Sequence, residues 1–385
     1  MPTNPQEDRI KIVDLLRTIS ILAVLANHFF SINFSPSSQA GGVAEQFFRP
    51  LYMRFALSGA YGVSIFFVLS GFLITRMTAS RNSNIYLVSR RQFYIRRAAR
   101  ILPLLILIFS FVLIVNVSCA LVPDGNVPQQ LSIIFSPDMH KFDWKFFLCC
   151  FTLTLNWLYI FTSNKYGMQL GILWSIAVEE QFYLLFPLWL RTAGNYKRFT
   201  SLLIILIILG PIARYLGNFY EGPKFTASFT NSFASFDLIS LGVLLFFTEQ
   251  KCRNFLSRSK SISVALCTFG TILVTATYFA TTTGDPTNRI YGPSVLGVGV
   301  FLCLLGGLQI KEFESIPKPI TMIGELSYGL YLYHPLVLFL LWPILLGKSA
   351  LLGFFLFVTT SVFLGWASLR YFEHPVNRLI RKRFL

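Results

Sequence analysis

Apolar runs separated by short polar segments dominate the chain from residue 12 to residue 370. Most runs are close to the roughly 20 residues that an α-helix needs to cross a hydrocarbon core about 30 Å thick. The pattern therefore predicts an all-α, polytopic membrane helical bundle with ten transmembrane helices. The predicted spans are 12–33, 55–76, 101–122, 171–190, 200–216, 229–248, 261–281, 293–309, 323–346 and 350–370.

An eleventh apolar run, 146–162, is short and is diluted by Asn156, two Cys and three Thr. With ten spans both termini are cytoplasmic, and 23 Lys and Arg residues lie inside against 8 outside. If the run crosses, the split becomes 13 inside and 18 outside. Because basic residues gather in cytoplasmic loops, we predict that 146–162 is an interfacial or re-entrant segment, covered by protein or water.

Composition agrees with a single membrane domain over residues 1–385. The chain is 54% hydrophobic and 13% charged, whereas about 25% of a soluble domain is charged. Its polar intervals, near 34–54, 77–100 and 123–145, are too short to bury cores of their own. The net charge of +16 fits cytoplasmic loops that meet anionic lipids, so membrane lipids rather than nucleic acid are the expected partners.

Two other readings of the sequence are not expected. Arg9 and Lys11 precede the first apolar run, and 38–40 is an acceptable cleavage site for a signal peptide. The run contains Arg17 and ends about ten residues before that site, so we expect a retained span. The six Cys show no CxxC pair and no ligand spacing, which predicts neither a disulfide framework nor a metal site.

Ionisable residues inside apolar spans are costly, so each is a candidate functional group. In the first span Arg17 and His28 are eleven residues apart, which places them within about 20° on one helical face and about 16 Å apart along it. His28 alone is equally consistent with a hydrogen bond to a neighbouring helix.

A basic run precedes the third span. Arg96, Arg97 and Arg100 can share one helical face, and planar guanidiniums match phosphate oxygens. Taken alone, this run is more typical of a topology anchor.

The span 171–190 carries Glu179 and Glu180. Adjacent helical residues point about 100° apart, so we expect only one of these carboxylates to reach a given cavity. The span 323–346 places Ser327, Tyr331 and His334 on one face.

Depth connects these groups. His28, Glu180, Asp237 and His334 fall in the middle or outer part of the predicted membrane, and the arginines fall on its inner side. We therefore expect one shared, water-accessible cavity.

With these residues assembled, the chain resembles the acyltransferase-3 family of integral-membrane acyltransferases over nearly its full length. Six segments carry the resemblance: the Arg17-to-His28 spacing, 62–74 (GVSIFFVLSGFLI), 94–103 (YIRRAARILP), 173–183 (LWSIAVEEQFY), 327–335 (SYGLYLYHP) and 373–375 (EHP). The chain departs from the family in having Thr18 where many members have a small residue, and we expect it to be a stand-alone member without the fused esterase-like domain that some carry.

The resemblance implies a membrane O-acyltransferase of the bacterial plasma (inner) membrane. It implies transfer of an acyl group, most often acetyl, from cytoplasmic acetyl-CoA to a hydroxyl of a cell-surface polysaccharide or lipid-linked glycan in the cell envelope. Acetyl-CoA is then a co-substrate, and no metal is expected. Acceptor, donor chain length and oligomeric state stay open.

The resemblance also implies roles for the candidate residues. Arg17, Arg96, Arg97 and Arg100 would bind the anionic end of CoA. His28 would be the general base, with Glu180 orienting its ring. Tyr331 or His334 would donate to the developing oxyanion, and direct transfer and an acyl-His intermediate both stay open.

One alternative belongs to another class of protein. Proton-coupled secondary transporters also carry Asp, Glu, His and Arg in their spans. Such transporters often show internal repeats, and none is visible in this sequence.

Overall fold

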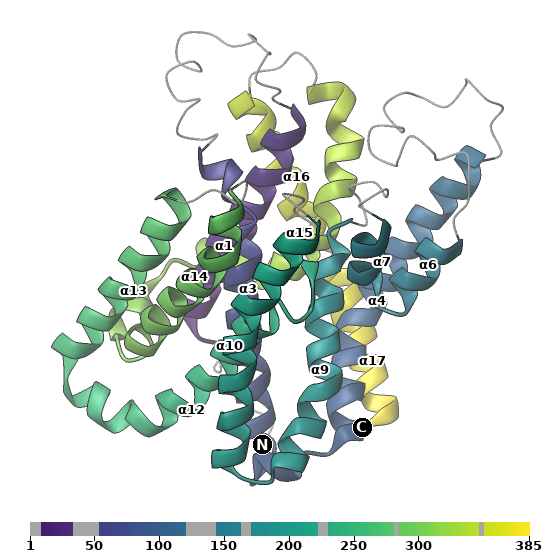
Figure 1. Ribbon diagram of the computed structural model, residues 1–385. Coiled ribbons are helices and arrows are strands. Elements are labelled where there is room, and N and C mark those ends of the chain that lie inside the picture. The colour runs from purple at the N-terminus through teal and green to yellow at the C-terminus, as the bar shows by residue number, and fades with distance from the viewer. Residues whose placement is uncertain are drawn as a thin grey trace, which may run out of the picture.

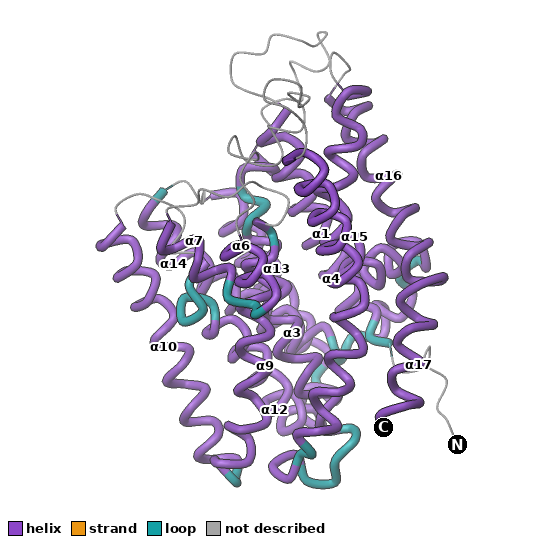
Figure 2. The backbone as a smooth tube through the Cα atoms, turned by 90° about the vertical axis from the view of Figure 1, so that its right-hand side faces the viewer, coloured by secondary structure: helices purple, strands orange, loops and turns teal. Residues whose placement is uncertain are grey.

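The computed structural model describes residues 9–33, 54–120, 144–162, 171–221, 230–280, 285–345 and 350–385. Within these ranges every regular element is helical (Figure 2). The α-helices are α1 (Lys11–Asn33), α3 (Tyr61–Ala79), α4 (Arg90–Ala120), α6 (Trp144–Phe151), α7 (Leu155–Thr162), α9 (Leu173–Ala193), α10 (Tyr196–Glu221), α12 (Phe236–Arg258), α13 (Lys260–Ala280), α14 (Pro286–Gly307), α15 (Lys318–Leu345), α16 (Ala350–Ser368) and α17 (His374–Phe384). Short helical turns are η1 (Ile85–Leu87), η2 (Lys311–Ser315) and the π-turn η3 (Leu369–Glu373).

The all-helical membrane fold predicted from the sequence is confirmed. In the described ranges, seven helices are long and apolar enough to cross a bilayer: α1, α3, α4, α10, α13, α14 and the helical stretch Ala350–Phe384. The other three predicted spans overlap α9, α12 and α15, and α12 lies further along the chain than the predicted span 229–248. Charged residues such as Glu180 in α9 and Glu249 in α12 reduce the apolar character of their helices. The count of ten spans stays a prediction.

The run 146–162 is not one continuous helix. It forms α6 and α7, each of 8 residues, and Leu153 between them has a φ of 57°. Eight helical residues rise about 12 Å, which is too short to cross the hydrocarbon core. α7 packs against α9, so protein covers part of this segment's backbone, as a segment that does not cross requires.

Contacts between distant parts of the chain sort the helix ends into two groups. The segments predicted to be cytoplasmic touch one another, through Arg9–Thr321, Lys11–Glu314, Lys260–Glu312, Arg191–Val88 and Asn377–Ala99. At the opposite helix ends Arg54 donates to the Phe279 carbonyl oxygen, and Tyr278 donates to that of Phe55. This sorting is the one that the ten-span arrangement requires.

The helices pack most closely where a glycine leaves room for the backbone of the neighbouring helix. α3 lies against both α1 and α12, while α13 and α14 form one flank of the molecule and α4, α6 and α17 the other (Figure 1). A Cβ on Gly71 of α3 would overlap the backbone of Ile239, and one on Gly242 of α12 would overlap that of Val68. Small residues allow membrane helices to pack this closely. The close contact with α12 fixes the position of α3, which carries one wall of the cavity described next.

Candidate functional site

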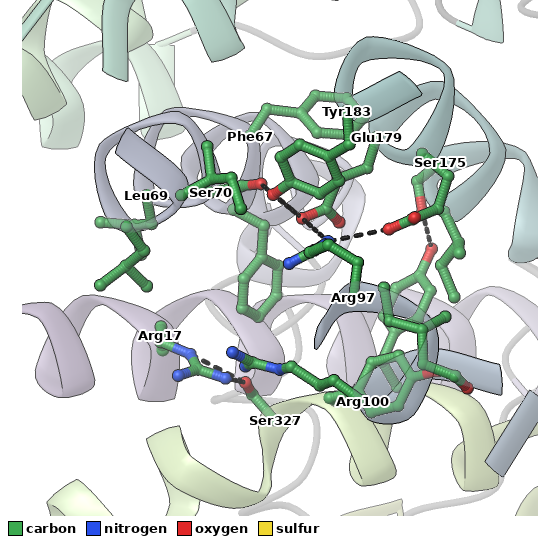
Figure 3. A pocket seen from close by; sticks show the side chains of 18 of the residues that line it. Arg17, Phe67, Leu69, Ser70, Arg97, Arg100, Ser175, Glu179, Tyr183 and Ser327 are labelled. Carbon is green, nitrogen blue, oxygen red and sulfur yellow. Dashed lines mark hydrogen bonds and ion pairs between the residues drawn. The ribbon is translucent and has the colours of Figure 1, made fainter. Parts of the chain in front are cut away.

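A cavity of about 120 Å³ lies among α1, α3, α4, α9 and α15. One part of its wall is apolar, with residues such as Phe67 and Leu69 of α3. The polar part combines hydroxyl, carboxylate and guanidinium groups from all five helices (Figure 3), namely Arg17, Ser70, Arg97, Arg100, Ser175, Glu179, Glu180, Tyr183, Ser327, Tyr328 and Tyr331. Five of the six predicted site residues other than the histidines line this cavity, namely Arg17, Arg97, Arg100, Glu180 and Tyr331.

Arg97 is held by two carboxylates and an aromatic ring, while its Nε is buried without a hydrogen-bond partner in the described part of the chain. Its Nη2 donates to Glu180 Oε1 at 2.8 Å and lies 3.7 Å from Glu179 Oε1. The guanidinium also stacks on the Tyr183 ring, with its carbon 3.7 Å from the ring centroid. The expectation that only one carboxylate shares the cavity is wrong, because two flexible Glu side chains on adjacent residues both reach one planar cation.

A compact network extends from Glu179 to α3. Tyr183, one turn further along α9, donates to Glu179 Oε1 at 2.5 Å. The Ser70 hydroxyl contacts both groups. These contacts fix α9 against α3 at the cavity wall. Sequence reasoning named neither Ser70 nor Tyr183 as a site residue, although both lie within the segments 62–74 and 173–183 that carry the family resemblance.

In the described ranges, Arg17 and Arg100 form no salt bridge with a carboxylate. Arg17 donates to the Ser327 hydroxyl through Nε at 3.1 Å and Nη2 at 2.8 Å. Arg100 lies close to this pair (Figure 3), and in the described ranges no hydrogen bond or ion pair engages its guanidinium. Two guanidiniums that face one cavity without a salt-bridged carboxylate have the chemistry that matches phosphate oxygens.

His28 and His334 form a pair beside the cavity. His334 Nε2 lies 3.1 Å from His28 Nδ1, and His334 Nδ1 lies 3.2 Å from the Leu330 carbonyl oxygen. A carbonyl only accepts, so Nδ1 of His334 carries a proton, and Nε2 of a neutral His334 accepts from His28 Nδ1–H. That assignment leaves Nε2 of a neutral His28 as a base.

The histidine pair and the cavity meet at Tyr331. The Tyr331 ring lines the cavity and lies 5.7 Å, between centroids, from the ring of His334. His334 is fully buried and His28 is half-buried. The Tyr331 hydroxyl donates to the Ile172 carbonyl oxygen at 2.8 Å and lies 2.7 Å from Ser175 Oγ. In this conformation its proton is therefore already used in a hydrogen bond to the backbone.

Two expectations from the sequence are not met, one for Glu180 and one for Asp237. Glu180 bonds to Arg97, and no hydrogen bond joins it to His28 in the described part of the chain, so the predicted orientation of His28 by Glu180 is wrong. Asp237 lies outside the cavity, because Arg214 binds it with Nη1 at 3.1 Å and Nη2 at 2.6 Å, and Ser294 donates to it at 2.8 Å. The sequence analysis did not single out Arg214. It is the one cation within the apolar run 200–216, and a cation in a membrane span needs an anionic partner.

Arg96 faces a smaller cavity of about 40 Å³ that adjoins the first. The two cavities share Ile74, Met77, Arg97 and Arg100 in their walls. In the described ranges no cluster of three or more His, Cys, Asp or Glu side chains has the arrangement of a metal site.

Comparison with known proteins gives a family and several relatives. The family model described as "Acyltransferase domain" matches residues 10–370. The peptidoglycan O-acetyltransferase OatA of Listeria monocytogenes is 27% identical over 95% of this chain and 55% of its own length. O-acetyltransferase OatA of Staphylococcus aureus is 26% identical over 85% of this chain and 54% of its length.

A third relative is closer to this chain in length. Nodulation protein 10 of Rhizobium leguminosarum bv. viciae is 29% identical over 73% of this chain and 72% of its own length. The chain spans about half the length of the two OatA proteins. No solved structure matches it.

Proposed function

Because this chain belongs to the acyltransferase family whose model matches residues 10–370, we propose that it is a multi-pass membrane O-acyltransferase that transfers an acetyl group from cytoplasmic acetyl-CoA. The observation that carries the proposal is a cavity with uncompensated arginines at one end and a hydrogen-bonded histidine pair beside the other. A donor with an anionic head and a neutral thioester tail matches both ends. Family membership favours this enzyme over a transporter.

Donor binding rests on the cations that remain free. Arg17 and Arg100, with Arg96 in the adjoining cavity, bind phosphate oxygens of CoA. Arg97 has a different role from the one the sequence predicted. Its charge is balanced by Glu179 and Glu180, so it positions the wall of the donor site rather than holding phosphate itself.

The acyl transfer step uses His28 as general base. An acceptor hydroxyl oxygen bonds to the thioester carbonyl carbon while His28 Nε2 takes the hydroxyl proton. The carbon–sulfur bond then breaks, and the proton passes to the CoA sulfur. His334 holds His28 in the tautomer with a basic Nε2. The Asp of a Ser-His-Asp triad fixes the tautomer of its histidine in the same way.

Tyr331 contributes to the wall next to the reacting thioester. Its hydroxyl bonds to the backbone of α9 and to Ser175. In the proposed reaction this hydroxyl turns from the Ile172 carbonyl to donate to the oxyanion.

The acceptor is proposed as a hydroxyl of a cell-surface glycan, and the membrane as the bacterial plasma membrane. One relative is named as a peptidoglycan O-acetyltransferase, so peptidoglycan is the first acceptor to test. A lipid-linked or other envelope polysaccharide is the second.

The test is transfer of radiolabel from acetyl-CoA to muropeptides by the full chain in nanodiscs. We expect the His28→Ala variant to lose about 100-fold to 10,000-fold of the rate. The control is His374→Ala, which removes an exposed imidazole at the start of α17. Retained turnover in His28→Ala would remove His28 from the mechanism.

A further inference from the structure

The smaller cavity is a strongly basic chamber at the end of the main one. Its walls come from the turn after α3, from α4 and from α17, and it has a volume of about 40 Å³. Arg81, Arg96 and Arg381 line this chamber alone, while Arg97 and Arg100 also line the main cavity. No Asp or Glu is among its lining residues.

The charge of this chamber is not cancelled by the protein. In the described ranges Arg81, Arg96 and Arg381 form no salt bridge, and Nε of Arg381 is buried without a hydrogen-bond partner. Partial desolvation, and after it the charges of Arg96 and Arg381, lower the pKa of the Arg81 guanidinium. Like charges that repel one another in a recess favour binding of a compact anion.

α17 contributes to the chamber in an ordered way. It packs against α4, where Asn377 Nδ2 donates to the Ala99 carbonyl oxygen at 3.0 Å. Arg381 is half-buried on this side, whereas Lys382 and Arg383 are exposed. The family match ends at residue 370, so Arg381 lies beyond the part of the chain that family membership covers.

We infer that Arg81, Arg96 and Arg381 bind the 3′-phosphate on the ribose of CoA, and that Arg17 and Arg100 bind its diphosphate; this inference rests on the proposed function. CoA carries two anionic groups at different distances from the thioester. The diphosphate is nearer, and the 3′-phosphate is at the far end. The two sets of free arginines follow the same order from the histidine pair, because the chamber adjoins the main cavity at Arg97 and Arg100.

The direct test compares binding of CoA and of 3′-dephospho-CoA to the full chain in nanodiscs of neutral lipid. Charge-assisted hydrogen bonds predict that wild-type protein binds CoA about 10-fold to 100-fold more tightly. Arg381→Gln is expected to weaken CoA binding and to leave 3′-dephospho-CoA binding unchanged, so that discrimination falls. Arg383→Gln, which removes an exposed cation from the same helix, is expected to retain full discrimination.

Three results would overturn the inference. One is equal affinity of wild-type protein for the two ligands. A second is loss of discrimination in Arg383→Gln as large as in Arg381→Gln, which would indicate a diffuse charge effect. The third comes from repeating the measurement in nanodiscs of anionic lipid. An Arg381→Gln defect that is equal for both ligands and is seen only there would assign the chamber to a lipid headgroup.

Binding and transfer separate this inference from the proposed function. Discrimination that depends on Arg381, without acetyl transfer to any hydroxyl, would uphold the phosphate site and contradict the reaction. Acetyl transfer with equal KM values for acetyl-CoA and its 3′-dephospho form would uphold the reaction and overturn the phosphate site.

Discussion

At the scale of single residues, pairing divides the buried cations into two kinds. Arg97 and Arg214 are bound by carboxylates of α9 and α12, and such pairs hold helices in register. In the described ranges, Arg17 bonds to the neutral hydroxyl of Ser327, and Arg100 forms no hydrogen bond or salt bridge. A buried cation beside a cavity is costly unless a ligand supplies the anion, so we propose that Arg17 and Arg100 mark the donor site.

The histidine pair leads to the first prediction. His334→Phe leaves His28 Nδ1–H without its acceptor, so we expect kcat to fall about 100-fold with little change in the KM for acetyl-CoA. His334→Asn and His334→Gln, which can still accept a hydrogen bond, should recover part of the loss. A higher KM for acetyl-CoA without a change in kcat would show that His334 binds the donor and does not position His28.

Arg97 leads to a second prediction, on stability. Arg97→Gln leaves Glu180 buried without its cation, which costs about 3–5 kcal/mol of unfolding free energy. Adding Glu180→Gln should restore part of the thermal unfolding midpoint, because no unpaired carboxylate then remains at that position. Arg91→Gln, at an exposed position of the same helix, is the control. A stable Arg97→Gln protein with only a raised KM for acetyl-CoA would instead make Arg97 a phosphate ligand, as the sequence predicted.

The sequence indicated which residue types carry chemistry but not how they pair. Helical spacing placed Ser327 and Tyr331 on one face of α15, and both line the cavity. Spacing alone could not show that Glu180 reaches Arg97, because that contact depends on side-chain torsions and on how α4 and α9 cross. The same limit hid the pairing of Asp237 with Arg214.

At the scale of helices, hydrophobicity predicted the elements well and their ends less well. The last predicted span, 350–370, does not end at its predicted boundary but continues through the π-turn η3 into α17. Pro375 is tolerated because it occupies the first turn of α17, where a backbone N–H has no intrahelical acceptor. This continuation is what brings Arg381 back onto α4.

The α3–α12 contact leads to a third prediction. Gly242→Val places a branched side chain against the α3 backbone at Val68, so α3 must move away from α12. We expect a lower thermal unfolding midpoint and loss of acetyl transfer, since α3 forms one wall of the cavity. Gly365→Ala should be tolerated, because its added Cβ would have no neighbour closer than 3.5 Å. Normal activity in Gly242→Val would contradict this packing.

At the scale of the whole molecule, contacts and charge agree on one basic end. The chamber with Arg81, Arg96 and Arg381 opens among segments that the positive-inside rule places in the cytosol. The neutral histidine pair lies deeper in the bundle. In the proposed account, a donor entrance on one side is joined to a reaction site further across the membrane.

This arrangement leads to a fourth prediction, on topology. Cysteines introduced at Ser83 and Ser315, which are exposed, should react with a membrane-impermeant maleimide only after cells are permeabilised. A cysteine at Thr287, exposed at the opposite helix ends, should react in intact spheroplasts. Labelling of the unsubstituted chain gives the background of its native cysteines. Reaction of all three positions from the same side would contradict the ten-span arrangement.

The central claim is that acetyl-CoA enters from the basic end and that its acetyl group is transferred at His28 to an acceptor from the other end. The most direct measurement uses vesicles with uniformly oriented protein, radiolabelled acetyl-CoA on the face that carries Arg381 and muropeptides on the opposite face. The account predicts labelled muropeptide with this arrangement and none when the two substrates are exchanged. Product formed only when both substrates are on one face would contradict it.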